Sequence, residues 1–199
     1  MGAASLQAGF DDPVREAQAV FRSVMMALAR PGTVQPLVTA LRPPAPLTPG
    51  LAAIALTLAD HETTLWLDAP LAASPAVADF LRFQTGARLV ANAVAATFAL
   101  VSDASAMLPL ASFAQGTDEY PDRSTTIIVA VDRIQTGAGL RLSGPGIKGS
   151  ASLTVSPLPR EFVSQRAANH ALFPRGVDCV FVASGTVAAL PRSTAMSEA

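Results

Sequence analysis

The chain has 199 residues, of which 50% are hydrophobic and 15% charged, and 14 basic residues nearly balance 15 acidic ones. This composition suits one compact domain, residues 1–199, and excludes a disordered chain and the basic footprint of a nucleic-acid-binding protein. No apolar run reaches the roughly 20 residues that span a bilayer, and residues 1–6 lack the pattern of a signal peptide. We therefore expect a cytoplasmic protein that recognises small molecules or other proteins, with no nucleic-acid or membrane partner.

Helix and strand signals alternate in the first half of the chain. Asp11 or Asp12 can cap a helix over residues 13–30, Pro13 suits its first turn, and Pro31-Gly32 ends it. The predicted apolar stripe of this helix is Val14, Ala17, Phe21, Val24, Met25 and Leu28. The elements that follow are predicted as a strand over 33–37, a loop over 41–50, a helix from 48 to about 58, a strand over 64–67, a helix from 74 to about 84, strands over 89–90 and 96–101, and a helix from 103 to about 113.

The second half is richer in strand signals. Residues 125–131 form a β-branched apolar run, typical of a strand that is buried on both faces. Residues 140–143 and 152–156 flank a glycine-rich turn, and Ser184-Gly185 links the strand-like runs 177–183 and 186–190, so both pairs are predicted hairpins. Because helices, including one over 159–172, interleave with these strands, we predict an α/β fold with a mixed sheet.

The sequence offers little support for metal or nucleophilic chemistry. His61 and His170 are the only histidines, and neither has the spacing of a zinc ligand. Cys179 is the only cysteine and lies in an apolar run, which favours a buried structural thiol. A Gly-x-Ser-x-Gly elbow is also missing. We therefore assign no catalytic, metal-binding or cofactor-binding residue.

A glycine-rich motif, Gly144-x-Gly146-x-Lys148-Gly149, follows a predicted strand. It matches the Gly-x-Gly-x-x-Gly pattern of dinucleotide-binding loops, but that loop must open a helix whose N-terminus holds the pyrophosphate. The residues after Gly149 alternate as in a strand instead. We interpret the motif as a hairpin turn, with Gly144, Gly146 and Lys148 as candidate contacts to a ligand or partner.

Two arginines are further contact candidates. Arg82 precedes Thr85-Gly86 at the end of a predicted helix, and Arg192 lies in the segment 191–194. Either guanidinium could bind a phosphate or carboxylate in fork geometry, or could be solvated or paired within the chain.

Seven segments occur in one order between Phe10 and Thr194. They are Phe10-x-x-Pro13-Val14-x-x-Ala17-Gln18-x-x-Phe21-Arg22, Arg30-Pro31-Gly32, Thr57-Leu58-Ala59-Asp60 ahead of Trp66-Leu67, Leu81-Arg82-Phe83-x-Thr85, Leu140-Arg141-Leu142-x-Gly144-Pro145-Gly146-Ile147, Phe173-Pro174-x-Gly176-Val177-Asp178 and Leu190-Pro191-Arg192-Ser193-Thr194. This succession resembles that of the PhnH family, whose members are subunits of the bacterial carbon–phosphorus lyase machinery for phosphonate breakdown. One departure is Asp122, where the family usually has Glu.

The resemblance implies a three-layer α/β/α fold like the major domain of pyridoxal-phosphate-dependent transferases, without that cofactor, and an ordered core from about residue 10 to 194. It implies an auxiliary, non-catalytic subunit that works with the G, I, J and L subunits and dimerises in isolation. In this system ATP and an alkylphosphonate give ribose 1-alkylphosphonate 5-triphosphate and adenine, and the J subunit, with an iron–sulfur cluster, later breaks the carbon–phosphorus bond.

Two other interpretations stay open at this stage. A free-standing pyridoxal-phosphate or nucleotide enzyme would need Lys148, the only lysine, or the glycine turn to face a deep pocket. A binding protein for ATP or phosphonate would depend on Arg82 and Arg192. The subunit interpretation itself predicts an exposed apolar patch for partner contact.

Overall fold

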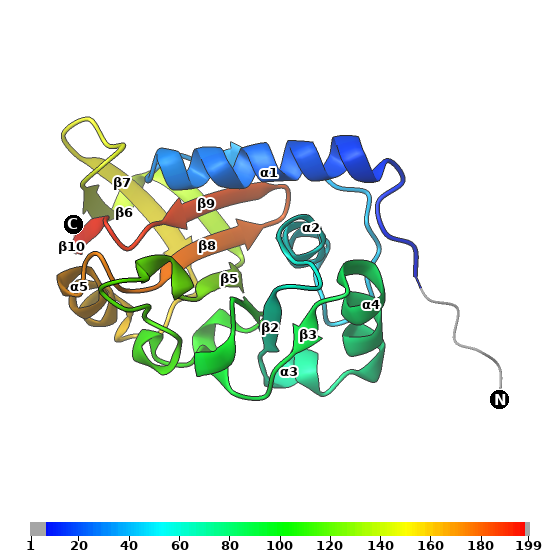
Figure 1. The fold of residues 1–199 in the computed structure, drawn as a ribbon. Coiled ribbons are helices and arrows are strands. Elements are labelled where there is room, and N and C mark those ends of the chain that lie inside the picture. The colour runs from blue at the N-terminus through cyan, green and yellow to red at the C-terminus, as the bar shows by residue number, and fades with distance from the viewer. Residues whose placement is uncertain (1–6, 198–199) are drawn as a thin grey trace, which may run out of the picture.

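The computed structural model describes residues 7–197, and Figure 1 shows how they form two β-sheets flanked by helices. The larger sheet has seven strands in the order β1-β9-β8-β5-β4-β2-β3, and the smaller has three in the order β10-β6-β7. The strands are β1 (Gln35–Pro36), β2 (Thr64–Leu67), β3 (Arg88–Leu89), β4 (Phe98–Val101), β5 (Thr126–Ala130), β6 (Arg133–Ser143), β7 (Ala151–Ser156), β8 (Asp178–Ala183), β9 (Thr186–Leu190) and β10 (Ala195–Ser197).

Most of the larger sheet is parallel. Strands β3, β2, β4, β5 and β8 run in the same direction, whereas β9 pairs antiparallel with β8, and β1 pairs antiparallel with β9. The predicted α/β class with a mixed sheet is therefore confirmed. Both predicted hairpins are confirmed as well, because β8 pairs with β9 across Ser184-Gly185, and β6 pairs with β7 across the glycine-rich turn.

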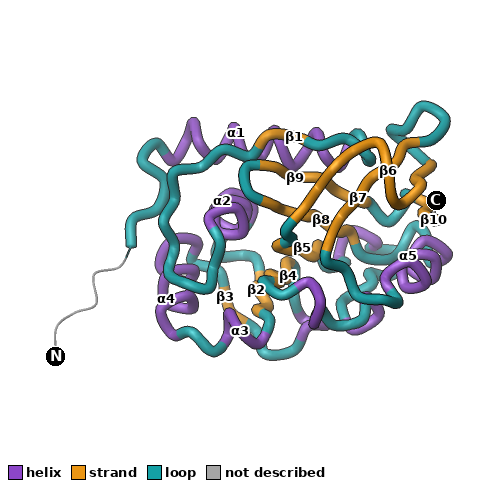
Figure 2. The backbone as a smooth tube through the Cα atoms, turned by 180° about the vertical axis from the view of Figure 1, so that it is seen from behind, coloured by secondary structure: helices purple, strands orange, loops and turns teal. Residues whose placement is uncertain are grey.

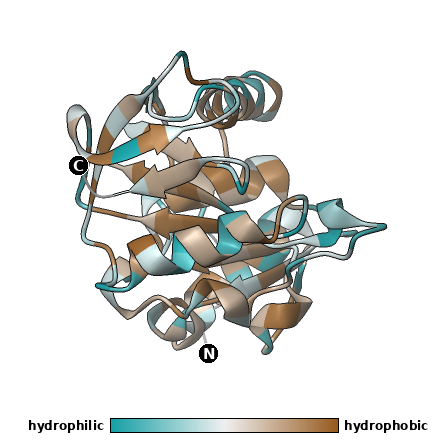
Figure 3. Ribbon diagram, turned by 90° about the vertical axis from the view of Figure 1, so that its left-hand side faces the viewer, coloured by the Kyte–Doolittle hydropathy of each residue, from teal (hydrophilic) through white to brown (hydrophobic). Residues whose placement is uncertain are grey.

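Each face of the larger sheet has its own core. Helices α1 (Pro13–Ala29), α2 (Pro49–Leu58) and α4 (Pro75–Thr85) pack on one face. The smaller sheet, α5 (Phe162–Ala171) and short 3₁₀ turns pack on the other, and β6 and β7 cross in front of the larger sheet in Figure 2. Figure 3 shows hydrophobic residues gathered in the central strands between these coverings.

Strand β5 shows how one run of residues serves both cores. Ile128 belongs to the core under the helices, whereas Ile127 and Val129 belong to the core on the opposite face. Successive side chains of a strand point to opposite faces, so a strand that is covered on both sides needs apolar residues at every position. The β-branched run predicted this arrangement correctly.

The core-facing side of α1 differs from the predicted stripe. Asp12 caps the helix and Pro13 opens it, as expected, but the buried residues are Val20, Val24 and Ala27. Val14, Phe21 and Met25, which the prediction placed in the stripe, are exposed. Apolar residues occupy two sides of this helix, so spacing alone could not determine which side packs on the sheet.

The helix predicted from 103 to about 113 is wrong. The segment forms two short 3₁₀ turns, η2 (Ala104–Ala106) and η3 (Leu110–Ser112). The Asp103 carboxylate accepts a hydrogen bond from the Ser105 amide at 3.0 Å, which competes with helix formation, and Pro109 provides no amide for a helix to continue through.

Several boundaries and small elements were also missed. Strand β6 has 11 residues instead of the predicted four over 140–143, because Gly137 and Gly139, with a register shift between Thr136 and Leu140, obscure its alternating pattern. The short helix α3 (Ala69–Ala72) and strand β10 had no sequence signal that we recognised. Among residues 7–197, no helix combines the length and apolarity that crossing a membrane requires.

Candidate functional site

Asp68 lies where the strand order of the larger sheet reverses. After β2 the chain forms β3 on one side of it and then crosses to form β4 on the other side. Open α/β sheets bind ligands outside the C-terminal ends of their strands at such a point. Asp68 directly follows β2, and Ser102 and Asp103 directly follow β4. These three residues therefore lie where the fold favours a ligand site.

The Asp68 carboxylate is occupied by hydrogen bonds from its own chain. It accepts from the Ser102 amide at 2.6 Å, the Asp103 amide at 3.0 Å, the Leu71 amide at 3.3 Å and the Ser102 hydroxyl at 3.0 Å. The residue is 7% exposed. These bonds join the ends of β2 and β4, so Asp68 holds the sheet edge together instead of presenting a free carboxylate.

Asp103, by contrast, is exposed. A hydrogen bond from the Ser105 side chain holds the pKa of its carboxyl below the ordinary value, so the group is charged at neutral pH. Sequence reasoning had singled out neither Asp68 nor Asp103. An acid directly after a short apolar strand, as in Leu67-Asp68, is the signal that could have found the first of them.

A pocket of about 520 Å³ opens at the same edge of the sheet, beyond the ends of β5 and β8. Its walls come from the chain after β1, the start of α2, the ends of β5 and β8, and the β8–β9 turn. The lining residues are Leu37, Val38, Thr39, Thr48, Pro49, Gly50, Ala130, Val131, Val182, Ala183, Ser184 and Gly185. Its volume is in the range of small-molecule sites, so it is the main candidate for a ligand pocket among the described residues.

The chemistry of this pocket is limited to hydroxyl and backbone groups. Thr48 accepts a hydrogen bond from the Leu51 amide and Thr39 accepts one from the Leu41 amide, which leaves their hydroxyl protons free to donate. No Asp, Glu, His, Cys, Lys or Arg is among the described residues that line it. The pocket can hold an apolar or weakly polar group, but the described lining supplies neither a general base nor a counter-charge for phosphate.

Polar side chains instead converge around α5, at the opposite edge of the sheet. Arg166 donates to the carbonyls of Val177, Pro191 and Thr194 at 3.3, 2.7 and 3.3 Å. Asn169 bonds both to the Val177 carbonyl, at 3.0 Å, and to the Val177 amide, at 2.8 Å. We call Arg166, Asn169, His170, Asp178 and Arg192 the α5 cluster. Its contacts join the segment before β8 to the segment after β9.

Of the predicted contact residues, Arg192 belongs to the α5 cluster. Its guanidinium pairs with the Asp178 carboxylate through Nε and Nη2 and donates to the Pro121 carbonyl. Its own carbonyl lies 3.1 Å from Nδ1 of His170. Arg82 lies elsewhere, on α4, where it pairs with Asp79 at 3.6 Å with both side chains exposed. The structure therefore does not bring these two arginines together.

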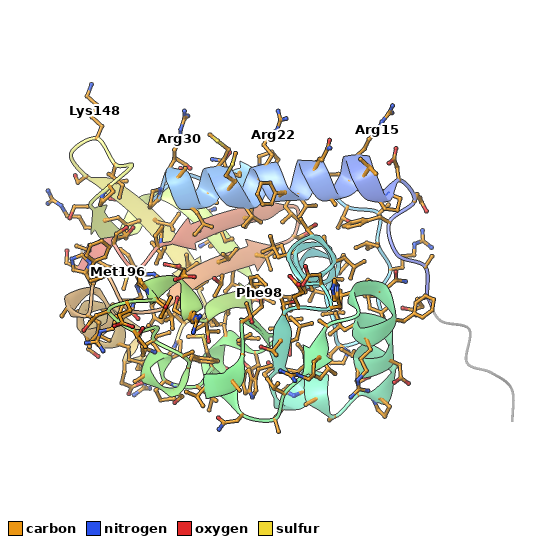
Figure 4. The ribbon with its side chains drawn as sticks, in the orientation of Figure 1. Arg15, Arg22, Arg30, Phe98, Lys148 and Met196 are labelled. Atoms are coloured by element: carbon orange, nitrogen blue, oxygen red, sulfur yellow. The ribbon has the colours of Figure 1, made fainter. Side chains whose placement is uncertain are left out.

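The glycine turn packs against its neighbours, and no helix follows it. A Cβ on Gly146 would collide with the Ala29 carbonyl at the end of α1, and one on Gly144 would lie 2.8 Å from the Ser193 carbonyl. Both glycines have positive φ angles, 81° and 130°. Lys148 is exposed and points away from the molecule (Figure 4). Gly144, Gly146 and Lys148 thus share the glycine turn, and Gly144 brings this turn next to Ser193, the neighbour of Arg192, whereas Arg82 lies apart from them.

Comparison with known proteins places the chain in a family. Residues 8–197 match the family described as "Bacterial phosphonate metabolism protein (PhnH)". The chain belongs to the PhnH family. A PhnH relative in Rhizobium meliloti (strain 1021), named "Alpha-D-ribose 1-methylphosphonate 5-triphosphate synthase subunit PhnH", is 45% identical over 185 residues, which are 93% of this chain and 92% of the relative. A proposed C-P lyase subunit protein, HtxG, of Stutzerimonas stutzeri is 36% identical over 177 residues, which are 89% of this chain and 84% of that protein.

The family assignment confirms the resemblance inferred from the sequence. The last three of the PhnH-like segments also meet in space. The α5 cluster connects the segment 173–178 with 190–194, and the glycine turn of the segment 140–147 packs on Ser193. The PhnH signature in the C-terminal part of this chain is therefore a set of mutually packed segments.

Proposed function

We propose that this PhnH chain is an auxiliary subunit of a carbon–phosphorus lyase system. It is required, together with partner subunits, for converting ATP and an alkylphosphonate to ribose 1-alkylphosphonate 5-triphosphate and adenine. The observation that carries this proposal is the 45% identity, over 93% of the chain, to a protein named as a subunit of ribose 1-methylphosphonate 5-triphosphate synthase. The similarity to HtxG supports it.

The internal use of polar side chains supports a non-catalytic role. Asp68 at the strand-order reversal and Arg192 in the α5 cluster are both committed to contacts within the chain. The pocket at the ends of β5 and β8 has no ionisable side chain among its described lining residues. A subunit that contributes surface and shape, rather than a complete set of reacting groups, fits these features.

The alternative functions find less support. An enzyme that forms an aldimine needs a lysine in an enclosed site, and Lys148 projects from a hairpin turn. A free-standing ATP or phosphonate receptor needs cationic side chains that converge, and Arg82 and Arg192 lie on separate parts of the fold. Gly144, Gly146, Lys148, Arg82 and Arg192 stay proposed contacts for a ligand or partner.

The finer properties of the chain are part of the same proposal. We infer one domain over residues 1–199, a cytoplasmic location, a homodimer in isolation, and partnership with the G, I, J and L subunits. We also infer a three-layer fold related to the major domain of pyridoxal-phosphate-dependent transferases. The helices on one face of the larger sheet, and α5 with the smaller sheet on the other, support this relation.

Reconstitution tests the proposal. The tagged chain is expressed with and without the G, I, J and L subunits, and the mass of each eluted species is measured. We expect a stable complex, and we expect adenine release from ATP and methylphosphonate to require this chain. If the other subunits assemble and release adenine equally well without it, the proposal fails.

A further inference from the structure

We propose that the outward side of α1 is a docking surface for a partner protein that presents an apolar ridge flanked by carboxylates. We call this surface the α1 face and define it by Val14, Gln18, Phe21, Arg22 and Met25. The inference rests on the proposed subunit function, because it names the surface through which such a subunit would bind its partner.

The α1 face exposes large apolar side chains in one line. Val14, Phe21 and Met25 are 66%, 52% and 46% exposed. Their separations of seven and four residues place them on the same side of a helix. Val20 and Val24 already anchor another side of α1 in the core, so packing within the chain does not require this second apolar line. An apolar line left in solvent marks an interaction site.

The α1 face borders a shallow, open groove of about 450 Å³. The groove is lined by Ala17, Gln18, Phe21, Arg22 and Met25 of α1 and by Thr57 of α2. Helices pack by placing the side-chain ridge of one into the groove of another. A groove between two helices therefore suits a helix or another ridge of a folded protein.

Charge defines the partner further. The side chains of Arg15, Arg22, Arg30 and Lys148 all extend from this side of the molecule (Figure 4). Arg15 lies 3.5 Å from Asp12, but the other three cations have no ion-pair partner among residues 7–197. No acidic residue is among the described residues that line the groove. The complementary partner is therefore apolar at its centre and acidic at its rim.

The same charges argue against a second copy of this chain as the occupant. Arg15 and Arg22 are seven residues apart, so they share one rim of the α1 face. If two α1 faces paired antiparallel about a two-fold axis perpendicular to the helices, this rim, with the unpaired Arg22, would face its own copy. Like charges opposed across an interface weaken association. A different protein with carboxylates at the matching positions avoids that repulsion.

The test compares variants of the α1 face with matched variants elsewhere. Phe21→Ser and Arg22→Glu alter the face. Phe83→Ser removes a phenylalanine that is 67% exposed on α4, and Arg160→Glu reverses an exposed charge near α5. Binding of each full-length variant to the co-purified G, I and J subunits is measured by calorimetry, and thermal melting verifies that each variant is folded. We expect each α1 variant to weaken binding roughly ten-fold or more, and each control less than about two-fold.

The outcomes separate this inference from the proposed function. If the wild-type chain does not bind the subunits, the proposed function fails. If the wild-type chain binds and the α1 variants bind equally well, only the docking inference is overturned. It is also overturned if Phe21→Ser converts an isolated dimer to a monomer in sedimentation, or abolishes binding to phosphatidylserine vesicles, because the occupant would then be a second copy or a membrane. Raising the salt concentration should reduce the effect of Arg22→Glu, since the charged rim is exposed.

Discussion

At the scale of single residues, Arg166 is the most constrained side chain of the α5 cluster. It is 1% exposed, and the acceptors of its guanidinium are three backbone carbonyls. A buried charge is tolerated only where hydrogen bonds replace its lost hydration. Arg166 therefore helps to hold the segment before β8 and the segment after β9 in position. Asn169 also donates to the Val177 carbonyl, and the Thr194 amide also donates to the Pro191 carbonyl.

Replacing Arg166 tests this role. We expect Arg166→Met to lower the free energy of unfolding by about 2–4 kcal/mol, because it removes the three hydrogen bonds of the buried guanidinium and leaves the Thr194 carbonyl without this donor. Arg160→Met, at an exposed position just before α5 begins, should change the free energy of unfolding by less than about 0.5 kcal/mol. Urea unfolding measures both values. Equal stability of Arg166→Met and the wild-type chain would show that the carbonyls find other donors.

Cys179 gives a prediction that depends on pH. Burial raises the pKa of its thiol from the ordinary 9.0 to about 11, and the opposing effect of nearby Arg166 is smaller. The folded chain thus holds the thiol proton more tightly than the unfolded chain does. The stability that this group contributes is complete below pH 9 and is lost as the pH rises from 9 to about 11.

Two measurements check this behaviour. A thiol-reactive disulfide reagent at pH 8 should modify the native protein far more slowly than the urea-unfolded protein, because the buried thiol is protonated and shielded. Between pH 9 and 11 the wild-type chain should lose more stability than Cys179→Ala, which lacks the titrating group. Rapid labelling of the native protein at pH 8 would contradict the buried position.

At the scale of elements, the glycine turn connects the smaller sheet to α1. Gly146 packs against the Ala29 carbonyl, and Gly149, three residues later, has open space where a Cβ would be. Both have left-handed backbone angles, with φ of 81° and 75°. A side chain would therefore strain the backbone at both positions, but only at position 146 would it also collide with a neighbouring residue.

This difference can be measured with one pair of variants. We expect Gly149→Ala to lower the free energy of unfolding by about 1–2 kcal/mol, which is the cost of a left-handed residue with a Cβ. Gly146→Ala should cost at least about 1 kcal/mol more, since the turn must also move away from α1. Thermal or urea unfolding of both variants gives the comparison. Equal losses would mean that the contact with Ala29 adjusts without cost.

At the scale of the whole molecule, the larger sheet has a hydrophobic core on each of its two faces. The α1 face lies on the outside of one of the helices that cover this sheet. Partner binding to the folded state stabilises it by mass action. We expect the melting temperature of the isolated chain to be unchanged by millimolar ATP or methylphosphonate, because the described lining of its best-formed pocket has no cationic residue.

The same melting experiment includes its own positive control. Addition of the co-purified partner subunits should raise the melting temperature of the chain, provided that its transition is resolved from theirs. Stabilisation by ATP or methylphosphonate alone would instead support the binding-protein alternative, and would direct attention to Arg82 and Arg192.

Short-range signals in the sequence predicted much of the secondary structure of this protein. Proline and side-chain caps define where α1, α2 and α4 begin, the β-branched run predicts β5, and two short turns predict both hairpins. These signals act over a few residues, so they are readable without the fold. The PhnH resemblance was readable as well, because it depends on the order of short segments.

Only the tertiary structure decided which side of α1 faces the core, where Arg192 finds Asp178, and which strand ends enclose the pocket. Each of these depends on contacts between residues far apart in the chain. The helix predicted over 103–113 failed for the same reason in part, since the core above β4 accepts Leu110 and Phe113 from irregular turns. Spacing states which side chains could share a face, but packing against the rest of the molecule determines which face is buried.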